Sequence, residues 1–390
     1  MPTEGTPAPD SPEVADAAGG LLGAYVHLPF CHRVCPYCDF AVTEGAEAAA
    51  VDRYLTALLM EIGAAPRRDP VDALFIGGGT PSALPPRRIG EVVDAVRDRV
   101  GLAHGAEVTV EANPEDLDDA QIEGLRAAGA TRLSVGVQSF DDTVLQYLGR
   151  RHSSAEAERA VLLAVEAMPS VSVDLIFGSP PEEASAWQRS VDTALRLGIA
   201  HLSAYALTVE PGTPLGREVA GGSPGPDDDV GADRYEVVLA LTDSAGLVRY
   251  ETSNFAAPGR VCRYNLITWA QGEYLGFGNG AHRHVDGVRS WNLRGVERYV
   301  AAVTEGRSAV AGEEHHTGWS REVERVMLGL RRAAGVVPGV AGRALLESEA
   351  GAALLEAKVL ARRDDRIAVT RPLLGDAAVR ALLALAPRDC

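Results

Sequence analysis

The sequence predicts an α/β protein, in which a partial (β/α)6 barrel is followed by a small, mostly helical C-terminal domain of winged-helix-like layout. Its 390 residues, 46% of them hydrophobic, are enough to bury a large core and to form more than one domain. In the first half, short apolar runs alternate with amphipathic stretches of helical length. This alternation predicts parallel strands joined by right-handed helical crossovers.

The strands of the barrel are expected in six apolar runs that end in polar or glycine-rich turns. They are residues 24–28, 73–77, 108–112, 132–137, 171–177 and 201–207. Helical periodicity follows most of them, at residues 50–64, 86–100, 117–128, 154–167 and 185–197. Six units are too few for a closed eight-stranded barrel, so we expect one that is open at the side.

Composition divides the chain into four regions. We expect a disordered tail (1–20), the barrel (21–250), a connecting segment (251–316) and the C-terminal domain (317–390). The tail has neither the basic start nor the apolar stretch of a secretory signal. No apolar run approaches the roughly 18–20 residues that span a bilayer, which predicts a cytoplasmic protein without a transmembrane segment. The net charge of −17 disfavours binding to nucleic acid.

The unusual motifs all fall at the carboxyl ends of expected strands. In α/β barrels these ends form the active-site face, so the motifs predict one common site. They are "FCHRVCPYCDF" (30–40), "GGGTPS" (77–82), "EANPE" (111–115), "GVQSFDD" (136–142) and "DLIFGSP" (174–180).

The first motif holds three of the five cysteines, Cys31, Cys35 and Cys38, in the spacing Cys-x3-Cys-x2-Cys. Structural zinc sites usually have four ligands and paired Cys-x2-Cys spacings, and the chain has no second pair. Zinc would need a fourth ligand such as His32, Asp39 or Cys262. A four-iron cluster normally takes one cysteine per iron, so three cysteines would leave one iron open.

Together with the downstream Gly-Gly-Gly-Thr-Pro, these cysteines resemble the radical S-adenosylmethionine (SAM) superfamily. The resemblance implies a [4Fe-4S] cluster whose open iron is chelated by the amino and carboxylate groups of SAM. It also implies that an electron from the cluster cleaves SAM to methionine and a 5′-deoxyadenosyl radical. The similarity narrows to the branch of the coproporphyrinogen dehydrogenases and HemW, and it extends from about Tyr25 into the C-terminal domain.

The resemblance implies ten residues that contact the cofactors. They are Tyr25 and Tyr37 beside the cluster and SAM; Gly78, Gly79 and Thr80 at the methionine moiety; Glu111 and Arg150 at its amino and carboxylate ends; Gln138 and Asp174 at the ribose hydroxyls; and Ala206 near the adenine. Charged ends need charged partners, and a diol suits a carboxylate and an amide. Taken singly, Glu111 could equally be a helix N-terminal acid, Arg150 a surface residue and Asp174 a cap or ion-pair residue.

The residues after Cys38 favour the HemW-type proteins over the dehydrogenases of this branch. The dehydrogenases usually carry a fourth cysteine in a Cys-x-Cys ending, whereas this chain has Phe40 at that position. HemW-type proteins lack that cysteine and resemble haem chaperones. This side of the branch implies haem, haem-requiring apoproteins such as membrane-bound respiratory enzymes, and an electron donor as partners.

Two alternatives keep the radical chemistry. The first is oxidative decarboxylation of coproporphyrinogen III to protoporphyrinogen IX, which would make the protein an oxidoreductase. The second is a SAM-dependent methyltransferase or cyclopropanase of a natural-product pathway. Both remain open at the level of the sequence.

Residues 250–292 resemble the HemW segment associated with haem, with two departures. The usual His-Asn-x-x-Tyr-Trp begins here with Tyr264 and has Thr268 in place of its tyrosine, while Asn265 and Trp269 are kept. The usual Gly-Pro-Gly-Ala-His-Ser reads Gly-Asn-Gly-Ala-His-Arg and contains His282. Tyrosinate can ligate ferric haem, so we expect Tyr264 or His282 as the axial ligand. The alternative is that Tyr264 and Trp269 only pack in the core.

Overall fold

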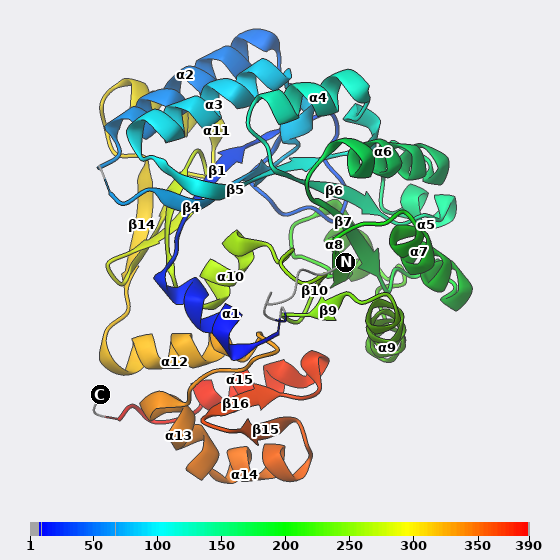
Figure 1. The fold of residues 1–390 in the computed structure, drawn as a ribbon, viewed down its shortest axis with the longest axis vertical. Coiled ribbons are helices and arrows are strands. Elements are labelled where there is room, and N and C mark those ends of the chain that lie inside the picture. Colours follow the sequence, from blue (N-terminus) through cyan, green and yellow to red (C-terminus); the bar gives the residue numbers. More distant parts are fainter. Residues whose placement is uncertain (1–7, 9, 67, 389–390) are drawn as a thin grey trace.

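The computed structural model describes residues 8, 10–66 and 68–388. Within them, twelve strands form one curved sheet in the order β14-β13-β12-β11-β1-β4-β5-β6-β7-β8-β10-β9 (Figure 1). All six predicted strands are present and pair in parallel. They are β1 (Leu22–Leu28), β4 (Val71–Gly78), β5 (Leu102–Ala112), β6 (Arg132–Gln138), β7 (Val171–Phe177) and β8 (His201–Ala206). The α/β class and the partial barrel are therefore confirmed.

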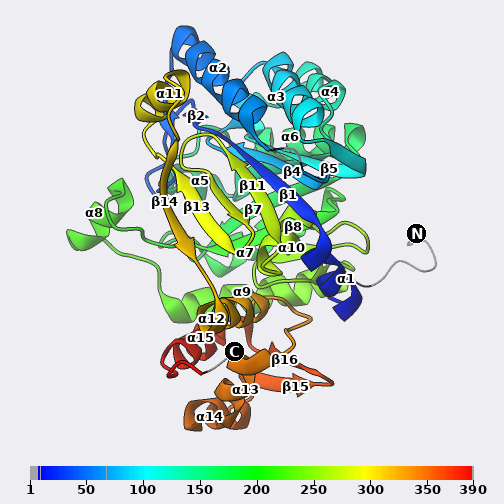
Figure 2. The same cartoon turned by 90° about the vertical axis from the view of Figure 1, so that its left-hand side faces the viewer.

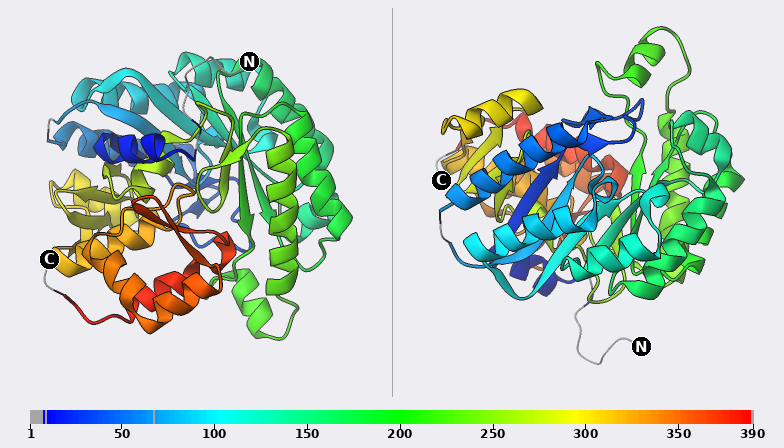
Figure 3. Two further views of the ribbon diagram at one scale, coloured as in Figure 1. Left: turned by 60° about the horizontal axis from the view of Figure 1, so that its bottom comes forward. Right: turned by 90° about the horizontal axis from the view of Figure 1, so that it is seen from above.

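The helices cover the outside of this curved sheet (Figure 3). They are α2 (Ala48–Ala64), α3 (Pro86–Arg99), α4 (Asp119–Ala127), α5 (Asp142–Tyr147), α6 (Ser154–Ala167), α7 (Ala184–Arg196) and α9 (Asp228–Ser244). Their starts follow local chemistry: Ser153 and Glu156 form a capping box at α6, and the Asp118 side chain caps α4. Leu58 of α2 and Leu74 of β4 are fully buried in the shared core.

Residues 251–316, which we expected to connect two domains, instead complete both edges of the barrel sheet. β10 (Asn254–Ala256) pairs antiparallel with β8 and with β9 (Val248–Arg249), while β11 (Glu273–Phe277) pairs parallel with β1. The sheet then continues antiparallel through β12 (His282–Val285), β13 (Val288–Asn292) and β14 (Val310–His315), with α11 (Val296–Thr304) between the last two. Strand edges carry unpaired backbone groups, and this segment supplies their partners.

The expected disordered tail is also partly wrong. Residues 1–7 and 9 lie outside the described residues, but Pro12–Ala17 form helix α1 and Ala18–Gly20 a 3-10 turn. The guanidinium of Arg332 donates to the carbonyl of Ala15 at 2.8 Å, and Arg366 pairs with the carboxylate of Asp16. The composition of the tail could not reveal these distant arginines, which hold it in place.

The C-terminal domain has its own apolar core and lies across the gap between β14 and β9 (Figure 1). As predicted, it is mostly helical, with one two-stranded hairpin. Its elements are α12 (Gly318–Gly329), α13 (Gly339–Glu347), α14 (Glu349–Glu356), β15 (Leu360–Arg363), β16 (Arg366–Val369), the 3-10 turn η4 (Pro372–Leu374) and α15 (Gly375–Leu383). Among the described helices, none is long and apolar enough to cross a membrane.

Short elements shape the two ends of the barrel. β2 (Phe30–Cys31) and β3 (Thr43–Glu44) pair with each other, and the turns η2 (Pro81–Ala83) and η3 (Pro114–Asp116) follow β4 and β5. Helix α8 (Pro214–Ala220) projects from the body of the molecule (Figure 2). Helix α10 (Arg263–Trp269) lies inside the ring of strands (Figure 1).

Candidate functional site

The three clustered cysteines lie in a loop directly after β1. Pairing of β2 with β3 closes this loop at its base, where the amide of Gly45 donates to the carbonyl of Cys31 at 3.0 Å. All three thiols are free and line one cavity of about 630 Å³ at the carboxyl ends of the parallel strands. The predicted common site is therefore present as a single cavity.

The surroundings of the sulfurs test whether they suit an iron–sulfur cluster. Thr80 Oγ1 lies 3.6 Å from Cys31 Sγ, and Arg150 Nη1 lies 3.4 Å from Cys35 Sγ. Burial raises the pKa of Cys31 to about 11 and also raises the pKa of Cys38. Cys31 and Cys38 therefore keep their protons unless a bound cation compensates, and the donors beside Cys31 and Cys35 would stabilise ionised sulfur ligands.

The geometry gives the zinc alternative no support. In the described part of the chain, no group of three or more His, Cys, Asp or Glu side chains is arranged to hold a metal ion. A four-iron cluster is larger than a single ion and takes each cysteine on a different iron. Three thiols spread around one cavity, with hydrogen-bond donors beside two of them, fit the cluster.

Nine of the ten residues expected at the cofactors line this cavity. They are Tyr37, Gly78, Gly79, Thr80, Glu111, Gln138, Arg150, Asp174 and Ala206. Tyr25 does not: its ring lies deeper in the barrel, stacked on Phe75 and Tyr264, and its hydroxyl is 3.0 Å from His27 Nδ1. Alternation along β1 directs Tyr25 into the barrel below the cysteine loop.

The glycines of "GGGTPS" are required by close packing. A Cβ on Gly78, whose φ is +112°, would lie 2.4 Å from the His27 ring, and one on Gly79 would lie 2.7 Å from the Phe30 carbonyl oxygen. The amide of Gly78 donates to the Glu111 carboxylate at 2.9 Å. The turn thus brings backbone against the cysteine loop and orients a carboxylate beneath it.

Two carboxylates face the inside of the barrel. The pKa of Glu111 is raised to about 7: burial raises it, the hydrogen bond from the Gly78 amide partly opposes this, and the nearby Asp174 adds to the increase. Burial also raises the pKa of Asp174, whose carboxylate accepts from the hydroxyls of Ser134 at 3.1 Å and Ser172 at 3.4 Å. A ligand that brings an amino group or hydroxyl groups would compensate these buried acids.

Arg150 and Gln138 complete the opposite wall. Arg150 Nη2 donates to the side-chain oxygen of Asn113 at 2.6 Å and to the carbonyl of Gly136 at 2.7 Å. Gln138 ends β6 with a φ of 69°, a conformation that non-glycine residues rarely adopt. Such strain is concentrated at binding sites, where the surrounding structure enforces it.

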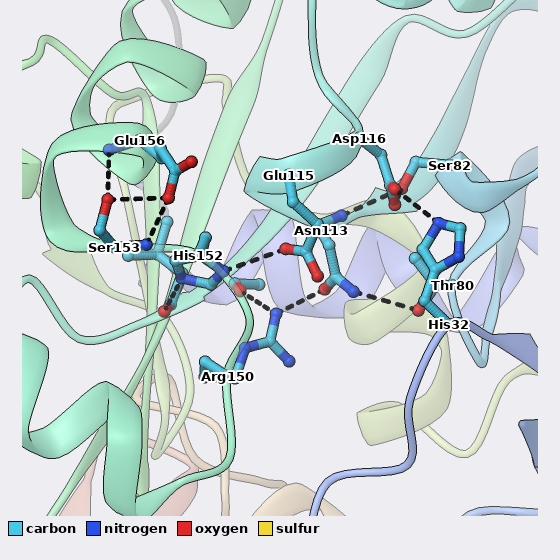
Figure 4. A network of polar contacts seen from close by, with 12 residues as sticks. His32, Thr80, Ser82, Asn113, Glu115, Asp116, Arg150, His152, Ser153 and Glu156 are labelled. Carbon is cyan, nitrogen blue, oxygen red and sulfur yellow. Dashed lines mark hydrogen bonds and ion pairs between the residues drawn. The ribbon is translucent and has the colours of Figure 1, made fainter.

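A polar network that the sequence analysis did not single out braces this wall (Figure 4). Asp116 binds His32 of the cysteine loop at 3.0 Å and accepts from the Ser82 hydroxyl at 2.7 Å. His152 lies 3.1 Å from the Glu115 carboxylate and 3.0 Å from the Val137 carbonyl. Asn113 and Glu115 belong to the "EANPE" motif, in which we expected a role only for Glu111, and Asp116 directly follows the motif.

The four residues expected at haem do not converge on one point. Tyr264 lies inside the barrel, 6.1 Å from the Tyr25 ring and 5.4 Å from that of Phe75, and burial raises its pKa well above the ordinary value. Asn265 hydrogen-bonds to the buried Tyr250. The guanidinium of Arg331 lies over the Trp269 ring, with its Cζ 4.4 Å from the ring centroid.

His282 differs from the other three because its side chain is exposed on β12. Its ring stacks on Trp291 of β13 with centroids 5.7 Å apart. The ring is partly covered by its neighbours, and this partial burial lowers its pKa; the nearby Arg289 and Arg294 lower it further. A neutral, accessible imidazole is the form that ligates iron.

Comparison with known proteins agrees with this architecture. The Radical SAM superfamily pattern matches residues 25–194. The chain is 41% identical to the haem chaperone HemW of Mycobacterium tuberculosis over 95% of this chain and 97% of that protein. It is 35% identical to HemW of Bacillus subtilis over 81% and 85% of the two chains.

A solved structure shows the same fold. The coproporphyrinogen III oxidase HemN of Escherichia coli superposes with a TM-score of 0.80 at 21% identity, covering 95% of this chain and 92% of that one. At this identity, the likeness concerns the fold alone. The sequence relatives decide the family: this chain belongs to the HemW family within the radical SAM superfamily.

Proposed function

We propose that this protein is a haem chaperone that holds a [4Fe-4S] cluster and SAM in the 630 Å³ cavity and delivers haem to apoproteins. The observation that carries the proposal is the cysteine loop itself. Three thiols line the cavity, and the position where a dehydrogenase would have its fourth cysteine holds Phe40, which is 67% exposed. Its relatives in M. tuberculosis and B. subtilis are named haem chaperones.

The residues of the cavity suit the two cofactors by their chemistry. Cys31, Cys35 and Cys38 would hold the cluster, which supplies an open iron and an electron. Glu111 would bind the amino group of SAM and Arg150 its carboxylate. The other eight expected residues would have the roles that the family resemblance implies, with Tyr25 acting from below the cavity through its aromatic stack.

For haem, we propose His282 as the axial ligand in preference to Tyr264. The imidazole of His282 is exposed and has one face on Trp291, which leaves room for a flat ligand beside it. Tyr264 is enclosed by Tyr25, Phe75 and Tyr274, and burial disfavours its ionised form. Tyr264 then serves to pack the barrel, and Trp269 to support Arg331.

The recipients would be haem-requiring apoproteins such as membrane-bound respiratory enzymes, and an electron donor would reduce the cluster. The test is anaerobic reconstitution of the full chain, followed by parallel assays of haemin binding and of coproporphyrinogen III turnover. We expect stable haemin binding and no decarboxylation. Production of protoporphyrinogen IX would instead establish a dehydrogenase, and methyl transfer from SAM would establish a methyltransferase.

A further inference from the structure

A second cavity, of about 310 Å³, lies where the open side of the barrel meets the C-terminal domain. One wall is the end of β8 and the turn before β10; the other is formed by α12, η4 and α15. Tyr205, Ala206 and Thr208 line both this cavity and the cofactor cavity. The two cavities are therefore neighbours that share the end of one strand.

The sheet leaves this strand end uncovered. β10 pairs with β8 only through Asn254–Ala256, and the last contact is from the Ala204 amide to the Ser253 carbonyl at 2.8 Å. In the described part of the chain, no strand pairs with Tyr205 on that side. Its side chain is 42% exposed, so a ligand can reach it from the second cavity.

The cavity lining combines apolar side chains with the guanidinium of Arg331, which its neighbours hold in place. Leu373 of η4 is 40% exposed and lines the cavity together with Met327 of α12 and Leu330, which directly follows α12. The guanidinium of Arg331 stacks on Trp269 and lies 3.3 Å from the carboxylate of Glu251, which is fully buried. Arg331 Nε is buried without a hydrogen-bond partner among the described residues.

These groups match a flat, mostly apolar ligand with a carboxylate at its edge. Neighbouring exposed apolar side chains beside a cavity, here Leu373 and Leu374 of η4, are typical of binding surfaces. A positioned arginine binds a carboxylate by charge-assisted hydrogen bonds. The Ser253 amide at 2.7 Å and the Asn254 side chain at 2.5 Å bind Oε1 of Glu251, while Arg331 Nη2 binds its Oε2 at 3.3 Å. Arg331 would therefore bind a second anion through its other N–H groups and keep its contact with Glu251. The acidic Asp376 also lines the cavity, on the C-terminal side.

We propose that this interdomain cavity receives the propionate edge of haem, with Arg331 as the anchor and Leu373 and Tyr205 against the macrocycle. The cavity is too small for a whole porphyrin, so the rest of the ring extends past Tyr205 toward the cofactor cavity. The inference rests on the proposed haem-binding function and makes the C-terminal domain part of the haem site.

The test compares haemin with its dimethyl ester, in which both propionates are blocked, on the reconstituted full chain. For the wild type, we expect haemin to bind at least about tenfold more tightly than the ester. This is the usual contribution of a charge-assisted hydrogen bond to affinity. Arg331→Met should weaken haemin binding by that factor and remove the preference. Arg331→Lys should restore part of it, and Arg307→Met, at a side chain 60% exposed elsewhere, should have no effect.

Leu373→Trp fills the cavity from an exposed position and should weaken the binding of both haemin and its dimethyl ester. The test therefore does not depend on the folding of the Arg331 variants. Cluster content and SAM affinity should stay unchanged in all variants. Equal preference in the wild type and Arg331→Met, or unaltered binding in Leu373→Trp, would overturn this inference while leaving the proposed function intact. Absence of haemin binding in the wild type would overturn both.

Discussion

The side-chain amide of Asn279 donates a hydrogen bond of 3.1 Å to the carbonyl of Ala41, joining two segments 238 residues apart. Asn279 is fully buried; it also donates to the Arg294 carbonyl at 2.8 Å and accepts from the Tyr54 hydroxyl at 2.9 Å. Ala41 is the last residue of the cysteine loop. Its carbonyl oxygen also lies 3.0 Å from Nε2 of His27. One buried amide therefore fixes the cysteine loop to the turn that precedes His282.

This contact predicts the effect of removing the amide. Asn279→Ala leaves buried partners unsatisfied and should lower the free energy of unfolding by about 1–3 kcal/mol. Because the loop loses its anchor, the reconstituted cluster should also decay faster in air. Urea unfolding and the decay of the cluster absorbance check the two effects. Thr304→Ala, on the exposed end of α11, is the control, and equal decay in both variants would contradict the anchoring role.

The identity of the metal centre is tested at the cysteines. After anaerobic reconstitution, we expect an oxygen-sensitive absorbance at about 400 nm, typical of iron–thiolate clusters. Cys35→Ala should abolish it, whereas Cys262→Ala should keep it, because Cys262 is buried away from the cysteine loop. Iron and sulfide analysis completes the measurement. Stoichiometric zinc without iron would show that the cluster assignment is wrong.

Glu111 should link SAM binding to pH. Its folded-state pKa of about 7 lies above its ordinary value of 4.5, so the stability that its neutral form contributes is full below pH 4.5 and is lost as the pH rises toward 7. The amino group of SAM donates N–H hydrogen bonds, and the ionised carboxylate accepts them more strongly than the neutral acid. The affinity for SAM should therefore increase as the pH rises through 7, with release of a proton.

Glu111→Gln removes this titration and should weaken SAM binding about tenfold or more, since a charged hydrogen bond is lost. Calorimetry in buffers of different ionisation enthalpy, below and above neutral pH, measures both affinity and proton release. Glu297→Gln, at a side chain that is 78% exposed on α11, serves as the control. If proton release were the same in Glu111→Gln and the wild type, another group would be responsible.

Two substitutions test which residue ligates haem: one removes an accessible side chain and the other an enclosed hydroxyl. His282→Ala should change the Soret band of bound haemin and weaken its affinity, because the accessible imidazole is removed. Tyr264→Phe should leave both unchanged, because only an enclosed hydroxyl is lost. A titration of the three proteins with haemin decides the matter. Identical spectra and affinities in all three would exclude both residues.

Much of the site was accessible from the sequence alone. The alternation of apolar runs and helical periods determined the six parallel strands, and the rule that barrel sites lie at carboxyl strand ends brought the five motifs together. The spacing of Cys31, Cys35 and Cys38 and the presence of Phe40 indicated the family and its branch. These features depend on residues close to one another in the chain, where periodicity and spacing carry the information.

Tertiary structure decided what depends on distant partners. Only the folded chain shows that residues 251–316 complete both sheet edges, that Arg332 and Arg366 hold residues 12–20, and that Tyr25 lies below the cavity rather than in its wall. The same holds for the pairing of Asn279 with Ala41. The packing of the whole molecule sets the partners of strand edges, buried charges and carbonyl groups. No local sequence pattern contains this information.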